Sequence, residues 1–281
     1  MDEILRIFWG FLSTVLFGGL LGLGLAVASR KLKVEKDETV EAIDGALPGL
    51  NCGSCGYAGC SGYAEALAAG EDEDLTKCKP GGSPSMEAIG KILGVEVDAN
   101  AVRMVACVHC HGGEGKAGRS FQYKGLKDCN AASILFNGEK SCKYGCLGLG
   151  SCISVCPVNA IEPTEDGLVR VNRDLCISCG KCVDICPNGV MRMIPEDADF
   201  IVACNSRDKG KATKANCSVG CIGCKICEKK FPEAGYKVED NLSIIRYDNR
   251  GPGRADAAEK CPVKCIIPYK DDISKKASEA G

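Results

Sequence analysis

The sequence predicts an α+β chain that begins with a transmembrane helix. Three observations carry this prediction: an uncharged apolar segment near the N-terminus, 22 cysteines grouped in short motifs, and an internal repeat with an offset of 75 residues. Aromatic residues make up only 5% of the 281 positions, so the apolar core is small. Bound metal would stabilise the fold in place of a larger apolar core, because the free energy of metal ligation is coupled to folding. We therefore expect the metal-free chain to be poorly folded.

The apolar segment runs from Ile7 to Ser29 without a charged residue. As a helix with a rise of about 1.5 Å per residue it would span about 34 Å, enough to cross a bilayer. Residues 1–30 are therefore predicted to be a single-pass membrane anchor. The alternative is a cleaved signal peptide with small residues at 26–28, but the acidic start and the length of the segment favour an anchor.

Four basic residues follow the anchor and predict its orientation: Arg30, Lys31, Lys33 and Lys36. By the positive-inside rule they place the rest of the chain on the cytoplasmic side of the cell (inner) membrane. That compartment is reducing and disfavours disulfides. The net charge of -2 and the lack of a long basic stripe argue against nucleic acid as a partner. Residues 31–46 are predicted to be a juxtamembrane linker.

Residues 47–100 are predicted to form a small helical domain around one set of four cysteines: Cys52, Cys55, Cys60 and Cys78. The glycines between them let the backbone wrap closely and turn amide N–H groups toward sulfur, which stabilises an iron-sulfur cluster. Four thiolates would also satisfy zinc, but this spacing matches no common zinc motif. A 4Fe-4S cluster is therefore the predicted occupant.

From residue 129 onward the sequence repeats 75 residues later without a gap. The matched positions are five cysteines and two prolines: Cys129 and Cys204, Cys142 and Cys217, Cys146 and Cys221, Cys152 and Cys227, Cys186 and Cys261, Pro157 and Pro232, Pro187 and Pro262. Residues 142–200 are predicted to be a two-cluster ferredoxin-like domain and 201–270 a partly degenerate copy. Residues 101–141 would then be a cysteine-containing connection and 271–281 a disordered tail.

The first copy contains the bacterial ferredoxin run Cys-x2-Cys-x2-Cys-x3-Cys-Pro, in which the fourth cysteine of each run ligates the other cluster. One 4Fe-4S cluster is therefore predicted on Cys156, Cys176, Cys179 and Cys182. The other is predicted on Cys146, Cys152 and Cys186, with Leu149 at the place of the fourth ligand. Cys142 is the nearest cysteine in sequence and is the candidate to replace it.

The second copy tests this assignment, because it lacks all four ligands of one cluster. Its residues at those positions are Phe231, Gly251, Arg254 and Ala257. It keeps four ligands for a single cluster: Cys221, Cys224, Cys227 and Cys261. Disulfides or inert core cysteines would not disappear as one cross-ligated set. We therefore expect Cys176→Ala to remove a cluster and a change at Gly251 to remove none.

Six cysteines remain, and the sequence leaves their roles open: Cys107, Cys110, Cys129, Cys204, Cys217 and Cys265. They are enough for a fifth cluster, with Cys107, Cys110, Cys129 and Cys142 as one set, but that choice leaves the cluster at Leu149 one ligand short. Cys107 and Cys110 followed by His111 also match a haem c attachment pattern, which the cytoplasmic placement opposes. His109 and His111 are either metal ligands or ordinary loop residues.

A basic stretch between residues 206 and 216 has two interpretations. Its cations are Arg207, Lys209, Lys211 and Lys214. They either dock an acidic electron donor by charge complementarity or form a solvated loop. The sequence contains no dinucleotide fingerprint, P-loop or nucleophile–base set. We therefore expect an electron conductor without a complete catalytic site of its own.

Residues 47–60, LPGLNCGSCGYAGC, with Cys78-x-Pro-Gly-Gly, the membrane helix and the ferredoxin motifs, resemble the B subunit of the Rnf electron-transport complex over essentially the whole chain. The resemblance implies a subunit of a membrane complex that moves electrons between reduced ferredoxin and NAD while translocating sodium ions or protons. It also implies that electrons from soluble ferredoxin enter here and pass to membrane and peripheral partner subunits, which hold the flavins and the NAD site.

The chain departs from the short form of that family by its cysteines between 107 and 129 and by its second ferredoxin copy. These additions leave the cluster count open at four, five or more. One alternative is a membrane-tethered polyferredoxin of another oxidoreductase, against which the motif at 51–60 argues. The other is an iron-sulfur redox sensor, which would not need so many clusters.

Overall fold

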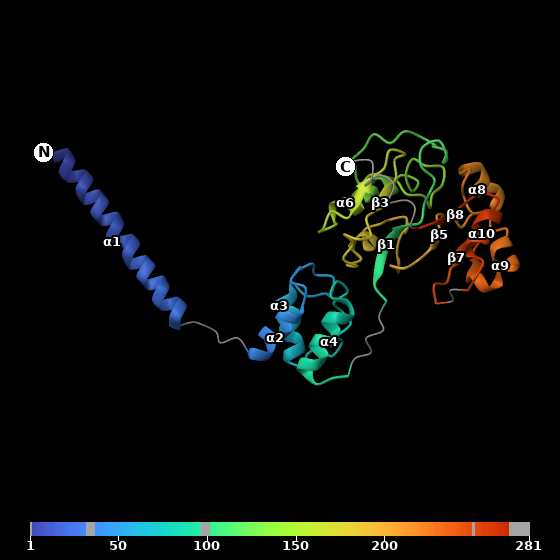
Figure 1. Cartoon of the computed structure of the whole chain (residues 1–281). Coiled ribbons are helices and arrows are strands. Elements are labelled where there is room, and N and C mark those ends of the chain that lie inside the picture. Colours follow the sequence, from blue (N-terminus) through green and yellow to red (C-terminus); the bar gives the residue numbers. More distant parts are fainter. Residues whose placement is uncertain (1, 32–36, 97–101, 249–250, 270–281) are drawn as a thin grey trace, which may run out of the picture.

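The computed structural model describes residues 2–31, 37–96, 102–248 and 251–269. Figure 1 shows a long N-terminal helix, a small helical domain and a body of short strands and helices, in chain order. The predicted α+β fold is thus confirmed. The predicted tail at 271–281 and residues 32–36 of the predicted linker at 31–46, with Lys33 and Lys36, lie outside the described residues. The rest of that linker differs from the prediction, because residues 38–46 form helix α2 (Glu38–Ala46) and pack into the helical domain.

The first helix, α1 (Asp2–Lys31), stands apart from the other described elements in Figure 1. Its stretch Arg6–Ser29 has a mean hydropathy of 2.1 and is not buried against protein. Large apolar side chains such as Trp9 and Phe17 are more than half exposed. Length and composition therefore suffice for this helix to cross a membrane, where lipid would cover the exposed apolar surface.

The small domain packs three helices around one apolar core. They are α2 (Glu38–Ala46), α3 (Cys60–Ala68) and α4 (Gly82–Leu93). Ile43, Tyr63 and Ile89, one from each helix, are almost fully buried against one another. The side chain of Asp37 caps α2 by accepting a hydrogen bond of 2.9 Å from the amide of Thr39. This core brings the loops before α3 and α4, which carry the cysteines, to one end of the domain.

The first ferredoxin-like repeat consists of two antiparallel strand pairs, β1 with β4 and β2 with β3. Its elements are β1 (Met104–Val108), α5 (Cys129–Ser133), α6 (Ser151–Ser154), β2 (Ile161–Pro163), β3 (Val169–Val171), α7 (Lys181–Asp184) and β4 (Met191–Pro195). Strand β1 comes from residues 101–141, which the cysteine spacing predicts to be a mere connection. The repeat therefore starts before residue 142, because β4 takes its antiparallel partner from that stretch.

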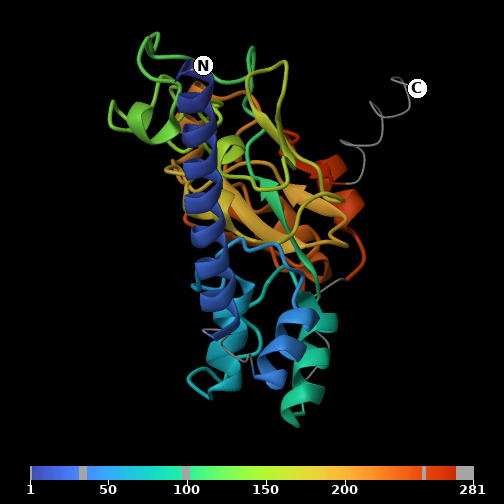
Figure 2. The same cartoon turned by 90° about the vertical axis from the view of Figure 1, so that its left-hand side faces the viewer.

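The second repeat has the same plan, with β5 paired to β8 and β6 paired to β7. Its elements are β5 (Phe200–Val202), α8 (Gly210–Asn216), α9 (Ile226–Lys230), the 3-10 turn η1 (Pro232–Ala234), β6 (Tyr236–Glu239), β7 (Leu242–Ile245), α10 (Arg254–Lys260) and β8 (Ile266–Pro268). Each repeat has its own buried cluster. Figure 2 shows the strands of both repeats together above the helical domain.

Tyr269, which follows β8, fastens the second repeat to the first. Its hydroxyl donates a 3.2 Å hydrogen bond to the carbonyl of Ala106 in β1. The guanidinium of Arg173 lies 4.1 Å from the centre of its ring. Because Tyr269 belongs to the buried cluster of the first repeat, that cluster extends across the boundary into the second repeat.

Candidate iron-sulfur sites

All 22 cysteines are free thiols, and 20 of them gather in five sets of four. We number the sets as site 1 (Cys52, Cys55, Cys60, Cys78), site 2 (Cys156, Cys176, Cys179, Cys182), site 3 (Cys129, Cys146, Cys152, Cys186), site 4 (Cys110, Cys142, Cys204, Cys217) and site 5 (Cys221, Cys224, Cys227, Cys261). Only Cys107 and Cys265 remain outside these sets.

Site 1 lies at the loop end of the helical domain. The Cys60 amide donates a 2.8 Å hydrogen bond to the side chain of Asn51, which holds the loop against the start of α3. A Cβ atom on Gly59 would lie 2.9 Å from that Asn51 side-chain oxygen, so glycine is needed there. Burial, together with the neighbouring site 1 thiols, raises the pKa of Cys78. The four cysteines expected together from the motif are thus brought together.

The Cys78 side of site 1 is tied to the motif loop by Asp72. The Tyr57 hydroxyl donates a 2.7 Å hydrogen bond to the Asp72 carboxylate, which also pairs with Lys77. The hydrogen bonds from Lys77 and then from Tyr57 lower the pKa of Asp72 to about 2. Asp72 is therefore ionised at neutral pH and joins the segments on either side of α3.

Site 2 contains the four cysteines predicted for the ferredoxin run and its crossed partner. Cys156 lies beyond α6, and the other three surround the start of α7. The Ala160 amide donates a 3.2 Å hydrogen bond to Cys156 Sγ. Burial raises the pKa of Cys182 to about 12, and the adjacent thiols add to the shift. In the absence of metal such a thiol keeps its proton, so ligation must release it.

Site 3 differs from the expected set, because Cys129 rather than Cys142 lies with Cys146, Cys152 and Cys186. A hydrogen-bond network at the start of α5 explains this. The Cys129 amide donates a 2.7 Å hydrogen bond to the Ser151 hydroxyl, and that hydroxyl donates a 2.7 Å hydrogen bond to the Asp128 carboxylate. Asp128 also caps α5 through the Ala131 amide at 2.8 Å. The network fixes α5 beside α6, so that Cys129 supplies the thiol missing at Leu149.

Site 4 is shared by the two repeats, each of which contributes two cysteines. Cys110 stands two residues after β1, and Cys204 stands two residues after β5. Cys142 and Cys217 stand four residues before Cys146 and Cys221, the first cysteines of the two ferredoxin motifs. The site is therefore pseudo-symmetric. The sequence offset of 75 pairs Cys204 with Cys129, but the strands pair it with Cys110.

Hydrogen bonds and close contacts adapt site 4 to charged sulfur. Two amides, from Ser206 at 3.4 Å and Cys221 at 3.2 Å, donate to Cys204 Sγ. A Cβ atom on Gly112 would lie 3.0 Å from Cys217 Sγ, so a larger residue would crowd that sulfur. Burial raises the pKa of Cys204 to about 12. The buried Lys140 ammonium donates a 2.9 Å hydrogen bond to the Gly112 carbonyl and places a positive charge beside the thiol of Cys217.

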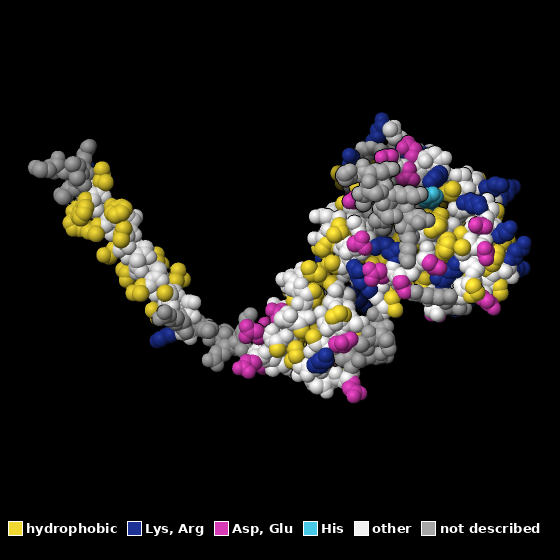
Figure 3. Space-filling view, in the orientation of Figure 1, with side chains coloured by type: hydrophobic (Ala, Val, Ile, Leu, Met, Phe, Trp, Pro, Cys, Tyr) yellow, Lys and Arg dark blue, Asp and Glu magenta, His cyan; other side chains and the backbone are white. Residues whose placement is uncertain are grey.

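Site 5 holds the four cysteines that the second copy retains. Cys224 is exposed, unlike the other three. Six exposed lysines stand in or directly before α8 and α9 of the second repeat, at positions 209, 211, 214, 225, 229 and 230. Figure 3 shows basic side chains gathered over this lobe. Hydrogen bonds from Cys265 lower the pKa values of Cys221 and Cys261 and raise that of Cys265, so the proton stays on Cys265.

The donor sets fit 4Fe-4S clusters better than zinc. Each site offers four thiols, and the four sites in the repeats line cavities between short loops. Amide N–H groups point at sulfur in sites 2, 4 and 5, as cluster sites require. Within the described ranges, no three cysteine, histidine or acidic side chains converge as ligands of one metal ion. A single zinc ion needs such convergence, with sulfur at about 2.3 Å.

Comparisons with known proteins agree with this interpretation. Residues 47–80 match a family described as "Putative Fe-S cluster", and residues 169–192 match a 4Fe-4S binding domain. The chain is 40% identical over 250 residues to the B subunit of the Na(+)-translocating ferredoxin:NAD(+) oxidoreductase complex of Acetobacterium woodii, covering 89% of this chain and 74% of that protein. The proton-translocating counterpart of Clostridium ljungdahlii is 37% identical over 269 residues, 94% of each chain.

The B subunit of the ion-translocating oxidoreductase complex of Methanosarcina acetivorans is 39% identical over 249 residues, 89% of this chain and 93% of that protein. The chain belongs to this family of B subunits. The resemblance inferred from residues 47–60 and Cys78 is thereby confirmed. As a B subunit, the chain is an iron-sulfur component of a multi-subunit membrane complex, and its membrane-length helix α1 fits that setting.

In this B subunit the second repeat is packed with protein atoms at the positions that match the cysteines of site 2. Arg254, at the position that matches Cys179, is buried. Its guanidinium donates hydrogen bonds of 3.0 Å to the Ala234 carbonyl and 2.6 Å to the Asp199 carboxylate. A Cβ atom on Gly251 would overlap the Glu233 carbonyl oxygen, which leaves no room for a cysteine there. The degenerate site is therefore a packed core and not an empty cluster cavity.

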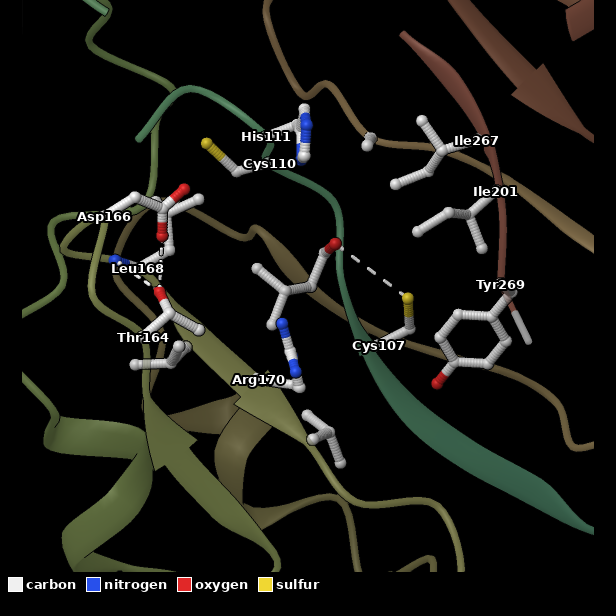
Figure 4. Close-up of a pocket in the computed structure, with 14 residues that line it drawn as sticks. Cys107, Cys110, His111, Thr164, Asp166, Leu168, Arg170, Ile201, Ile267 and Tyr269 are labelled. Atoms are coloured by element: carbon white, nitrogen blue, oxygen red, sulfur yellow. Dashed lines mark hydrogen bonds between the residues drawn. The ribbon is translucent and has the colours of Figure 1, made fainter. Parts of the chain in front are cut away.

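The Cys107–His111 segment of the B subunit does not form a joint metal or haem site. Cys107 and Cys110 line one cavity between the repeats, but Figure 4 shows their sulfurs pointing in different directions. Cys110 lines site 4 with Cys142, Cys204 and Cys217. His109 is buried, which lowers its pKa to about 4, and its Nδ1 lies 2.9 Å from the Val202 carbonyl. His111 contacts Lys116 at 2.9 Å, so neither histidine joins a cysteine set.

Proposed function

We propose that this B subunit relays single electrons from reduced ferredoxin to its partner subunits, within a complex that couples ferredoxin:NAD oxidoreduction to Na+ or H+ translocation. The names of the relatives from Acetobacterium woodii and Clostridium ljungdahlii state that activity for those complexes. When bound, each 4Fe-4S cluster exchanges one electron. The observation that carries the proposal is that five four-cysteine sites adjoin one another in a single series.

Two hydrogen bonds and one shared cysteine run support the order of the series in the ferredoxin repeats. The Cys221 amide of site 5 donates to Cys204 of site 4, and the Cys146 amide of site 3 donates 3.4 Å to Cys110 of site 4. Sites 3 and 2 are interleaved, because the run that ends in Cys186 supplies its other thiols to site 2. The order 5–4–3–2 therefore follows from shared segments.

Site 1 continues the series beyond site 2. Burial raises the pKa of Cys179, and the nearby thiol of Cys52 raises it further, whereas a hydrogen bond from the Lys181 amide lowers it. A site 1 thiol therefore lies near a site 2 thiol. Site 1 belongs to the helical domain that follows α1 directly in the chain. We infer that electrons leave at site 1 toward membrane subunits, on the cytoplasmic side.

Site 5 is the proposed point at which ferredoxin electrons enter. Cys224 is exposed there, and the surrounding lysines suit an acidic carrier. Of the basic stretch singled out from the sequence, Arg207 pairs with Asp240 at 2.9 Å, whereas Lys209, Lys211 and Lys214 are exposed. Docking of ferredoxin at this lobe would bring its cluster next to the first site of the series.

Iron and acid-labile sulfide per chain, measured on anaerobically reconstituted full-length protein, test the relay. We expect about 20 irons and 4Fe-4S signals in electron paramagnetic resonance after reduction, because each of the five sites binds about four. Four irons or fewer, or bound zinc, would contradict the relay. Limited proteolysis of inside-out membrane vesicles tests the orientation, since the repeats should be accessible from the cytoplasmic side.

The docking step is tested by the rate at which reduced ferredoxin reduces the full-length protein. Lys225→Glu together with Lys229→Glu should slow this reaction at low ionic strength and flatten its salt dependence. The matched control is Lys91→Glu, an exposed charge reversal on α4 of the helical domain. Equal slowing by the control would show that general charge, and not a site on the second repeat, governs the encounter.

A further inference from the structure

Sites 3 and 5 are the corresponding cavities of the two repeats, but one lining position differs in chemistry. Val190 directly precedes β4 and lines site 3. Cys265 directly precedes β8, the matching strand, and lines site 5. Both side chains are almost fully buried. A hydrogen-bond donor thus stands in the second repeat where the first has a hydrocarbon side chain.

A second lining position shows the same change. Val169 of β3 lines site 3 and pairs with Pro163 of β2. Ser243 of β7 lines site 5 and pairs with Val238 of β6, the residue that matches Pro163. Ser243 is buried like Val169. At these two matched positions site 5 therefore has side-chain donors where site 3 has hydrocarbon, and the other donors that line site 3, Ser151 and Asn188, donate to Asp128 and Gly145 instead of sulfur.

Both donors contact sulfur atoms of the proposed ligands. Cys265 Sγ lies 3.7 Å from Cys261 Sγ, and Ser243 Oγ lies 3.2 Å from Cys227 Sγ. Cys227 and Cys261 would be deprotonated as ligands, so the S–H and O–H groups must act as the donors. The Ser243 amide adds a hydrogen bond of 3.5 Å to Cys221 Sγ.

Cys265 is placed as a neighbour of the ligand set rather than a member of it. Its carbonyl accepts a 2.7 Å hydrogen bond from the Ala203 amide, which fixes its backbone at the β5–β8 pair. Cys261 is followed by Pro262, as Cys186 is by Pro187 in site 3, and Cys224 supplies the thiol that Leu149 lacks. Four ligands are thus present without Cys265.

We propose that Cys265 and Ser243 are positioning residues that donate hydrogen bonds to the ligand sulfurs of site 5 and raise its reduction potential above that of site 3. The inference rests on the proposed function, in which site 5 holds a 4Fe-4S cluster. Reduction adds a negative charge, so donors to sulfur stabilise the reduced form more than the oxidised form. A higher potential at site 5 would favour electron transfer from ferredoxin into the chain.

The test is a redox titration of anaerobically reconstituted full-length protein, followed by electron paramagnetic resonance, with iron measured on the same samples. Cys224→Ala first identifies the site 5 component as the one that disappears. In Cys265→Val and Ser243→Val that component should shift to lower potential, and in the double variant it should shift further. The matched reverse variants, Val190→Cys and Val169→Ser, should raise the potential of the site 3 component, which Cys129→Ala identifies.

Iron content should stay at the wild-type value in the four hydrogen-bond variants. An unchanged site 5 potential in the Cys265→Val, Ser243→Val double variant would overturn the inference. Loss of one cluster in Cys265→Val would overturn it as well, because Cys265 would then be a ligand. If Cys224→Ala lost no iron, the ligand set of site 5 would itself be wrong, and the proposed relay would fail at that site together with the inference.

Discussion

The amide of Cys146 donates a 3.4 Å hydrogen bond to Sγ of Cys110. The equivalent amide in the second repeat, that of Cys221, donates a 3.2 Å hydrogen bond to Cys204. One residue of each repeat therefore belongs to a ferredoxin-type site and also contacts a sulfur of site 4. This pseudo-symmetry makes site 4 the junction between the repeats, so a change in site 4 should affect both.

Site 4 should behave as one site assembled from two repeats. We expect Cys142→Ala and Cys217→Ala each to lower the iron content by about four per chain, because either change removes a ligand of the same cluster. The double variant should lose no more than either single variant. Iron analysis of the three reconstituted proteins checks this. A loss of about eight irons in the double variant would place the two cysteines in different sites.

Cys129 should be a ligand of site 3, whereas Cys107 should not. Cys129→Ala is expected to lose about four irons per chain, since Leu149 leaves no other thiol at that corner of the cavity. Cys107→Ala, a change at a buried cysteine outside the five sets, is the control and should keep the full iron content. The opposite pattern would restore the alternative in which Cys107 completes a cluster.

Arg254 should stabilise the second repeat without holding iron. Arg254→Ala leaves the buried Ala234 carbonyl without its donor, which costs about 1–3 kcal/mol, and also removes the donor to the part-buried Arg246 carbonyl. Arg207→Ala, which breaks an exposed pair with Asp240, should cost about 0–1 kcal/mol. Anaerobic thermal unfolding measures both, and Arg254→Ala should unfold at a clearly lower temperature.

The same Arg254→Ala protein serves as the partner of Cys176→Ala in an iron assay. Cys176→Ala should lose about four irons, and Arg254→Ala should lose none. Arg254 suits this comparison better than Gly251, because a side chain at 251 would collide with the Glu233 carbonyl. Equal iron loss in both would mean that the second repeat keeps a second cluster.

The Tyr57–Asp72 hydrogen bond should protect site 1 at neutral pH. Hydrogen bonding lowers the pKa of folded Asp72 to about 2, below the unfolded value of about 3.9. The contribution of ionised Asp72 to the stability of the folded domain is therefore fully present above about pH 4 and is lost as the pH falls toward about 2. Asp72→Asn should release iron to a chelator severalfold faster than wild type at neutral pH, and the difference should shrink in acid, below the unfolded pKa.

Tyr57→Phe is the matched change on the other side of this bond. It should accelerate iron release at neutral pH in the same direction but less than Asp72→Asn, because Lys77 still pairs with Asp72. If neither variant differed from wild type at neutral pH, the Asp72 contacts would not contribute to holding site 1.

The sequence by itself determined the features that depend on short stretches of chain. These are the membrane-length helix, the site 1 motif, the site 2 set and the absence from the second repeat of cysteines at all four positions that match site 2. Each of these sets contains three thiols a few residues apart, and the fourth is supplied by a recognisable motif, so spacing is enough to group them. The family followed from the same motifs.

Only the tertiary structure decided which thiols complete sites 3 and 4. Cys129 reaches site 3 because Asp128 and Ser151 fix α5 beside α6. Cys110 and Cys204 meet in site 4 because β1 and β5 end next to each other around a shared core, a relation that the ungapped offset hides. Cysteine spacing shows only which thiols are close along the chain. Which sulfurs share a cavity depends on how the strands pack, because packing brings residues together that are distant in sequence.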